Sequence, residues 1–189
     1  EDEHKDQHQR GRDDHGKAGA GFLQILELTA EFHDVAVRKF DLLADAFIRG
    51  AAEAGHEVVK CDLARKNIRG CTACDRCFSS GKPCVFDDDF NEIAPLIQRA
   101  DIIVFVTPLY WYTFPAQLKA AIDKLYSFEV GKKKLDISGA ILIACGGDPE
   151  EFYFDGIISS YRLILRHLHW EDMGRLIVPG VNNKGDVLS

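Results

Sequence analysis

The feature that most constrains this chain is a pair of short runs near its centre that are apolar throughout, apart from Asp101 at the start of the first run. Residues 101–106 read DIIVFV, and residues 139–145 read GAILIAC. Runs of this length that are apolar at every position are typical of strands buried on both faces of a parallel sheet. Because parallel strands need long crossover connections, the segments between them are expected to contain helices.

The rest of the chain alternates in the expected way. Further strands are predicted over residues 22–28, 56–63 and 175–178, and helices over residues 41–55, 87–100, 115–128 and 155–168. Gly55 is well placed to end the first helix, and Pro115 suits the first turn of the third. Carboxylates that could cap the second helix are Asp87, Asp88 and Asp89. The alternation predicts an α/β fold, a flavodoxin-like three-layer sandwich whose five-stranded parallel sheet has the order 2-1-3-4-5.

Charge and hydropathy exclude several function classes. The net charge is −7, whereas a nucleic-acid binder normally carries a basic face. No apolar run approaches the ~18 residues of a membrane span, and no secretory signal pattern is present near the start. We therefore expect no nucleic-acid or membrane partner, and a cytoplasmic location.

The first twenty residues differ in composition from the rest. Residues 1–20 hold no Val, Ile, Leu, Phe, Tyr or Trp, but six acids, four bases and three histidines. Such a segment cannot bury enough apolar surface to offset the entropy of ordering it. We predict a polar, disordered tail over residues 1–20 and a single flavodoxin-like domain over residues 21–189. Metal binding by His4, His8 and His15 is the less favoured alternative.

Two loops at the predicted switch point could hold a ligand. In open parallel sheets, ligands bind beyond the carboxyl ends of the strands, where the strand order reverses. Residues 107–115, after the most buried strand, hold four aromatic residues, which are costly to leave in water. A planar ring system or a dimer interface would cover them. After the next strand, Gly146 and Gly147 would let a ligand approach the backbone closely and accept from its N–H groups.

A cysteine motif occupies the long loop between residues 64 and 85. The spacing C-x2-C-x2-C-x6-C is formed by Cys71, Cys74, Cys77 and Cys84. Four thiolates this close in one loop can ligate a [4Fe–4S] cluster, and zinc can also use four thiolates. Reduced thiols without a metal, or a disulfide, remain alternatives. The other two cysteines, Cys61 and Cys145, fit small core residues better than ligands.

At these motifs the chain resembles flavodoxin-fold NAD(P)H-dependent FMN reductases. Residues 107–111 (TPLYW) and 115–124 (PAQLKAAIDK) are similar to the flavin loop and following helix of that family. Residues 71–77 (CTACDRC) and 84–90 (CVFDDDF) are similar to its iron–sulfur flavoprotein branch. The resemblance implies an enzyme that uses FMN, takes NAD(P)H as co-substrate, and passes reducing equivalents to a quinone, a flavin or a similar small-molecule acceptor. The flavin contacts that it implies are Pro108, Leu109, Tyr110, Trp111, Tyr112, Gly146 and Gly147. Because the flavin carries the chemistry, we expect no catalytic side chain.

One loop departs from the family pattern. The family's first loop resembles Gly-Ser-Pro-Arg followed by Gly-Asn, and it cradles the FMN phosphate at a helix N-terminus. Here residues 29–40 contain no glycine and include Glu31 and Asp34, which would repel a phosphate. A two-base frame difference across residues 31–37 would restore a similar loop, and a truly altered loop is the alternative. Which residues hold the phosphate is therefore left open.

Two further functions are compatible with the sequence. The cysteine motif would also suit an iron–sulfur flavoprotein acting in one-electron transfer. The glycine-free first loop would suit a flavin-free flavodoxin-fold protein that acts through protein contacts.

Exposed aromatics in the loop at residues 107–115, with Phe128 and Phe152, would leave much apolar surface on a monomer. We therefore expect a homo-oligomer, either a dimer or a tetramer.

Overall fold

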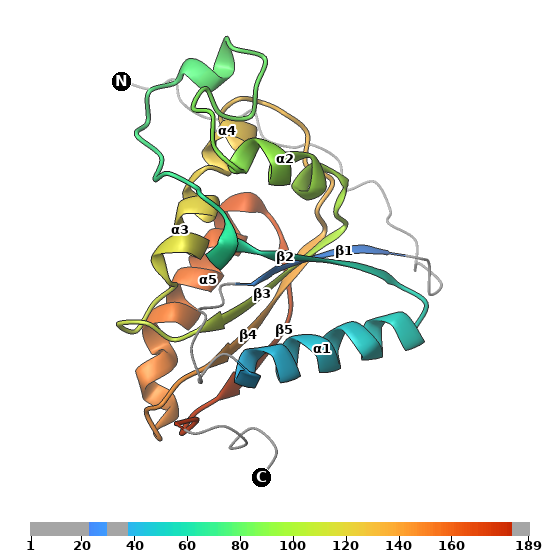
Figure 1. Ribbon diagram of the computed structural model, residues 1–189, viewed down its shortest axis with the longest axis vertical. Coiled ribbons are helices and arrows are strands. Elements are labelled where there is room, and N and C mark those ends of the chain that lie inside the picture. The colour runs from blue at the N-terminus through green and yellow to red at the C-terminus, as the bar shows by residue number, and fades with distance from the viewer. Residues whose placement is uncertain (1–22, 30–37, 183–189) are drawn as a thin grey trace, which may run out of the picture.

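The computed structural model describes residues 23–29 and 38–182 (Figure 1). The predicted tail at residues 1–20 lies outside these ranges, and so do residues 30–37, which include both acids of the first loop. The predicted strands and the helices between them fall within the described residues, apart from residue 22 at the start of the first strand.

Five parallel strands form one sheet in the order β2-β1-β3-β4-β5, which confirms the predicted topology. The strands are β1 Gln24–Thr29, β2 Glu57–Asp62, β3 Ile102–Pro108, β4 Gly139–Cys145 and β5 Glu171–Val178. Strand β3 lies in the middle, and all seven of its residues are buried. The run at residues 101–106 is therefore apolar because both of its faces are covered.

Helices cover both faces of the sheet, unequally. The helices are α1 Arg38–Glu53, α2 Phe90–Arg99, α3 Ala116–Asp123, α4 Tyr126–Glu129 and α5 Asp155–Leu168, with short 3₁₀ turns η1 Leu63–Arg65, η2 Arg76–Phe78 and η3 Glu151–Phe154. Ala44 of α1 packs with Ile25, Val104 and Ile143 on one face. The larger core on the other face takes buried residues from α2, α3, α4 and α5. Figure 1 shows α1 on one side of the sheet and these helices on the opposite side.

The end of α1 follows its sequence signal. Gly55 has a φ of +88°, and the His56 N–H donates to the Ala51 carbonyl at 3.0 Å. A positive φ is costly for residues with a Cβ, so glycine at this position ends the helix, as predicted.

Three sequence expectations need correction. The helix predicted over residues 115–128 is two helices, because residues 124–128 wind more tightly and bury Lys124 and Phe128. Phe128 is therefore a core residue and adds no exposed apolar surface, whereas Phe152 is 60% exposed. Strand β5 begins at Glu171 rather than at residue 175. Strand β5 lies at the edge of the sheet, where exposed polar residues are tolerated, so its first half shows no apolar pattern in the sequence.

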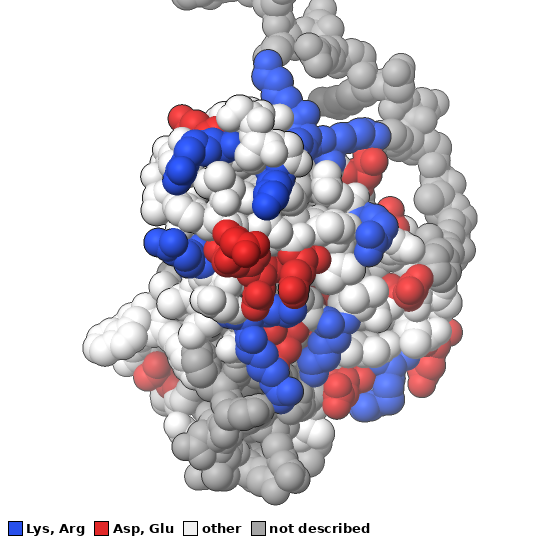
Figure 2. All heavy atoms as spheres, turned by 45° about the horizontal axis from the view of Figure 1, so that its top comes forward, with Lys and Arg blue, Asp and Glu red and all other residues white. Residues whose placement is uncertain are grey.

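The face that bears the cysteine loop carries both signs of charge. Figure 2 shows a compact group of acidic side chains there with Lys and Arg side chains around it, and no continuous basic patch on this face. Among the helices in the described ranges, none is long and apolar enough to cross a membrane.

One buried hydrogen bond ties α5 to the centre of the sheet. The Tyr161 hydroxyl donates to the Ala140 carbonyl at 2.6 Å and lies 3.2 Å from the Asp172 carboxylate. Burial is the main cause that raises the pKa of Tyr161 above its ordinary value, and the nearby Asp172 acts in the same direction. The folded protein therefore keeps this hydroxyl protonated at a pH where the unfolded chain loses the proton.

We predict that Tyr161→Phe lowers the free energy of unfolding by about 1–2 kcal/mol at pH 7, because the buried Ala140 carbonyl loses this hydroxyl donor. The wild type should then lose this advantage above pH 10, where unfolded tyrosine, with an ordinary pKa of about 10, ionises while folded Tyr161 does not. Urea unfolding at pH 7 and pH 10.5 measures both effects. Tyr153→Phe is the control, since in the described structure its hydroxyl makes no hydrogen bond. Equal effects of the two variants would contradict the prediction.

Candidate functional site

The carboxyl ends of β1, β3 and β4 meet at the point where the strand order reverses. Pro108 at the end of β3 lies opposite Cys145 at the end of β4. The next residue, Leu109, donates its N–H to the Cys145 carbonyl at 2.8 Å. The aromatic loop and the glycine loop therefore begin side by side, as the switch-point argument predicts. The loop after β1, towards which an FMN phosphate was expected, lies outside the described residues.

The aromatic loop is a tight hairpin with a strained tip. Tyr110 and Thr113 exchange two backbone hydrogen bonds of 3.2 and 3.1 Å. Between them Trp111 has a φ of +45° and Tyr112 a φ of +64°. This is the pattern of a type I′ turn, whose central positions usually hold Asn-Gly. Left-handed backbone at a residue with a large side chain costs about 1–3 kcal/mol, and such strain concentrates at functional sites.

The hairpin presents its aromatic rings to solvent. Trp111 is 91% exposed, and the flanking residues Tyr110 and Tyr112 are each nearly half exposed. An apolar ring held out by a strained turn gains no burial to offset the strain within the described chain. The tip is therefore suited to a planar ligand or to another surface.

The start of α5 supports the hairpin. A Cβ at Gly156 would overlap the Tyr112 carbonyl oxygen, so glycine allows the turn to approach the helix. The Tyr112 ring stacks on Tyr153 at 5.8 Å between centroids and 20° between planes, and Phe152 continues the row at 4.1 Å. Sequence reasoning missed Gly156 and Tyr153, because nothing in their spacing links them to residues forty positions earlier.

The glycine loop is tied to the chain that follows β5. Gly146 donates its N–H to the Val178 carbonyl at 3.2 Å. This N–H, which was expected to donate to a ligand, is therefore already paired with the backbone. A Cβ at Gly146 would press on Leu109 at 3.1 Å, and a Cβ at Gly147 would overlap the side chain of Asn182. Asn182 donates to the Gly147 carbonyl at 2.9 Å. Both glycines thus have a packing role in addition to any contact with a ligand.

The four motif cysteines line one hollow that opens to solvent. Cys71 and Cys74 are exposed, Cys77 and Cys84 are half-buried, and all four are thiols. No three Cys, His, Asp or Glu side chains of the described ranges are placed to hold a metal ion. Zinc and an iron–sulfur cluster can each take four thiolates, the number of cysteines that line this hollow.

The thiols differ in their tendency to ionise. Hydrogen bonds from Arg76, first from its backbone and then from its side chain, lower the pKa of Cys74. Burial raises the pKa of Cys77. Outside the loop, burial raises the pKa of Cys61 to about 11, and Cys145 is buried in β4. A core thiol with a high pKa is a poor ligand, which fits the prediction for Cys61, and the burial of Cys145 fits its prediction as a core residue.

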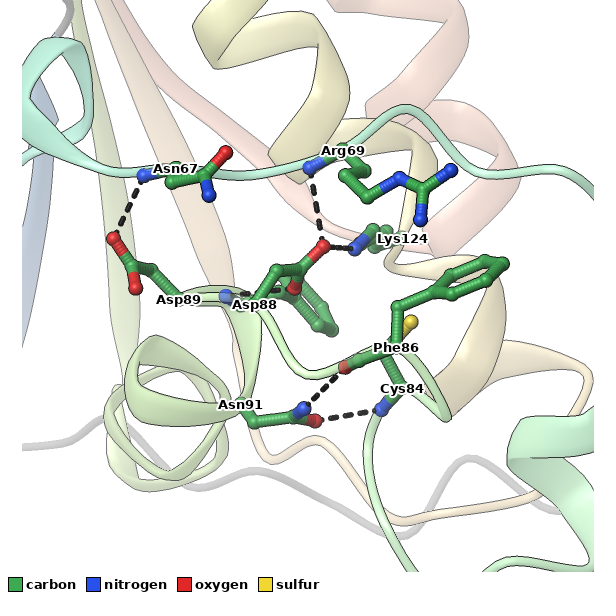
Figure 3. A network of polar contacts seen from close by, with 9 residues as sticks. Asn67, Arg69, Cys84, Phe86, Asp88, Asp89, Asn91 and Lys124 are labelled. Atoms are coloured by element: carbon green, nitrogen blue, oxygen red, sulfur yellow. Dashed lines mark hydrogen bonds and ion pairs between the residues drawn. The ribbon is translucent and has the colours of Figure 1, made fainter.

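The cysteine loop is held at both ends by the residues that begin α2 (Figure 3). Asp89 accepts from the Asn67 N–H at 2.7 Å and Asp88 from the Arg69 N–H at 3.1 Å. Asn91 accepts from the Cys84 N–H and donates to the Phe86 carbonyl, both at 2.8 Å. The start of α2 therefore closes the loop at its two ends.

This arrangement corrects the prediction of three helix caps. Only Asp88 takes part in capping, since its Oδ1 accepts from the Phe90 N–H at 3.2 Å. Asp89, at the N-cap position, makes no side-chain cap bond, because its carboxylate reaches across to Asn67.

A buried ion pair lies beneath the loop. Lys124, in the turn between α3 and α4, pairs with Asp88, and their side chains are 2% and 1% exposed. Breaking a buried pair by removing one partner costs about 3–5 kcal/mol, because the other charge stays buried. Sequence reasoning missed Lys124, since lysine in an amphipathic helix usually faces solvent.

A sequence model of the flavodoxin-like fold family matches residues 28–187. The chain belongs to this family. Of curated relatives, an iron-sulfur flavoprotein of Archaeoglobus fulgidus is 29% identical over 128 residues, which cover 65% of this chain and 57% of that protein. Ribosyldihydronicotinamide dehydrogenase [quinone] of Mus musculus is 28% identical over 120 residues, which cover 53% of this chain and 51% of that protein. The flavodoxin-like chain thus spans about half the length of these relatives.

A solved structure agrees with the fold. An NAD(P)H:quinone oxidoreductase from Methanothermobacter marburgensis is similar with a TM-score of 0.65 and 23% identity, over 89% of this chain and 92% of that one. At this identity the similarity concerns the fold. It fits the observed five-stranded sheet of this flavodoxin-like protein.

We predict that Trp111→Asn raises the free energy of unfolding by up to about 1 kcal/mol in protein without added flavin. Asparagine tolerates the left-handed conformation better, and the exposed tryptophan loses little packing. Urea unfolding measures the change. Val130→Asn, a matched loss of an exposed apolar side chain at an ordinary φ of −73°, should give no gain. A loss of stability in Trp111→Asn would show that the turn is not strained.

Proposed function

We propose that this flavodoxin-like protein is an FMN-dependent oxidoreductase that takes reducing equivalents from NAD(P)H and passes them to a quinone, a flavin or a similar small-molecule acceptor. The observation that carries the proposal is the strained hairpin at the carboxyl end of β3. It holds exposed aromatic rings at the sheet's switch point, beside the glycine loop. The names of the flavoprotein and the quinone-reducing relatives support the same chemistry.

The chain's own residues would bind and orient the flavin ring. Residues Pro108 to Tyr112 would lie against the ring system, and the exposed rings would exclude water from one of its faces. Its pyrimidine end would lie near Gly146 and Gly147. When bound, FMN supplies the hydride chemistry between nicotinamide and acceptor. No side chain of the chain is needed as a general acid or base, so we assign no catalytic residue.

We predict that the double variant Tyr110→Ala/Trp111→Ala weakens FMN binding roughly ten- to hundredfold, equivalent to the loss of about 1–3 kcal/mol of stacking. Quenching of flavin fluorescence on titration gives the dissociation constant, and NADH or NADPH oxidation with a quinone gives the activity. Both should fall together.

A matched control removes two exposed apolar side chains elsewhere. Leu163 on α5 and Met173 on β5 are 65% and 45% exposed, so Leu163→Ala/Met173→Ala should leave FMN affinity unchanged. An FMN dissociation constant within twofold of wild type in Tyr110→Ala/Trp111→Ala would show that the hairpin is not the ring site. Wild-type protein that binds no FMN would overturn the proposed function itself.

A second candidate function is one-electron transfer through an iron–sulfur cluster, and the shared cysteine hollow favours it. Cys71, Cys74, Cys77 and Cys84 would hold the cluster, which supplies single-electron chemistry when bound. The hollow lies at the end of α3 and the hairpin at its start. The helix has eight residues, about 12 Å at 1.5 Å per residue, so the two proposed centres would be close neighbours.

We further propose that the protein is a homo-oligomer, either a dimer or a tetramer. Trp111 and Phe152 are 91% and 60% exposed at one end of the sheet, and a second copy would cover apolar surface there. Light scattering at micromolar concentration should give at least twice the mass of one chain. The mass of a single chain would contradict this proposal and leave the flavin proposal standing.

A further inference from the structure

Two buried polar side chains face the four cysteines. Lys124 and Ser127 line the same hollow as Cys71, Cys74, Cys77 and Cys84. They come from the tightly wound turn that joins α3 to α4, and they are 2% and 4% exposed. Both residues therefore belong to the wall of the hollow that the cysteines share.

The Ser127 hydroxyl is buried and lacks a partner. Its Oγ makes no hydrogen bond to any atom of the described residues. A buried hydroxyl without a partner costs about 1–3 kcal/mol, and native structures rarely keep one without a reason. Because Ser127 lines the hollow, an acceptor held there would satisfy it.

Lys124 presents a positive charge to the same space. An ammonium group has three N–H donors, and within the described structure its hydrogen-bond acceptor is Asp88. The Asp88 carboxylate lies away from the hollow, where it also accepts from the Arg69 and Phe90 N–H groups (Figure 3). Lys124 lines the hollow and Asp88 does not, so the cationic residue of the pair is the one that adjoins the thiols, and a negatively charged sulfur cluster would complement it.

Resting on the proposed iron–sulfur function, we propose that Ser127 and Lys124 are positioning residues that donate hydrogen bonds to the sulfurs of a four-iron cluster held by the motif cysteines. Reduction adds an electron to a cluster that is already negative. Donors and positive charge near its sulfurs stabilise the reduced form most and so raise the reduction potential. Ser127 and Lys124 would then set the potential at which electrons leave or enter the cluster.

The test compares reduction potentials in the full chain. Wild type, Ser127→Ala and the control Ser79→Ala are reconstituted anaerobically with ferrous iron and sulfide. Ser79 is exposed in the same loop, and its hydroxyl lies 3.5 Å from the Arg76 carbonyl. Iron and sulfide are counted, and the cluster is titrated with redox dyes while its absorption and electron paramagnetic resonance are recorded.

Ser127→Ala should keep the full cluster content and lower the potential by about 30–60 mV, a three- to tenfold change in a one-electron equilibrium. Ser79→Ala should match wild type. The double variant Asp88→Asn/Lys124→Met, which avoids leaving one buried charge unpaired, should lower the potential further. If that variant does not fold, Ser127→Ala still decides.

The possible failures are distinct. A Ser127→Ala cluster with wild-type potential would overturn the donor role and leave the cluster itself in place. Wild type that takes up no iron and sulfide, or that binds zinc alone, would overturn both the cluster and this proposal. FMN binding, titrated separately on the same protein, tells whether the flavin function survives either result.

Discussion

The buried ion pair between Asp88 and Lys124 holds together the three segments on which the cysteine loop depends. Its carboxylate binds the loop backbone at Arg69, caps α2 at Phe90 and pairs with the lysine that ends α3. Both side chains are removed from water, so each charge is stabilised chiefly by the other and by these backbone donors. This one pair therefore ties the loop to the start of α2 and to the turn after α3.

Helix α3 connects this pair to the other candidate site. It begins after the aromatic hairpin and ends at Asp123, next to Lys124, so a single helix joins the hairpin to the wall of the cysteine hollow. The hairpin in turn lies on α5 through Gly156 and Tyr153. Two candidate sites from different loops are thereby placed at fixed positions relative to one sheet. A flavin and a cluster bound in them would keep a constant separation, which suits electron transfer between them.

Strain and unsatisfied polarity mark the same places as the sequence motifs. The hairpin tip has left-handed backbone at two aromatic residues, and the hollow buries a hydroxyl without a partner in the described structure. Outside the motifs, left-handed backbone also occurs at Lys132 and at His169, which follows the end of α5, and at Gly55 a glycine takes the positive φ that ends α1. Strained backbone and unsatisfied polar groups are expected at sites where a protein binds a ligand or a partner.

The sheet order, the central strand and the residue types of both sites could be predicted from sequence alone. Apolar runs at residues 101–106 and 139–145 are typical of a parallel strand covered on both faces, and the cysteine spacing is local. What could not be predicted depends on contacts between distant segments. The capping role expected of Asp89 is replaced by a bond to Asn67, the helix over residues 115–128 breaks where Lys124 turns inward, and Phe128 is buried. Periodicity shows which face of a segment is apolar. It does not show that a charged side chain is buried, because that depends on a partner from another part of the fold. The sequence by itself therefore determined the architecture and the chemical groups of the sites, and the tertiary structure decided which side chains orient them.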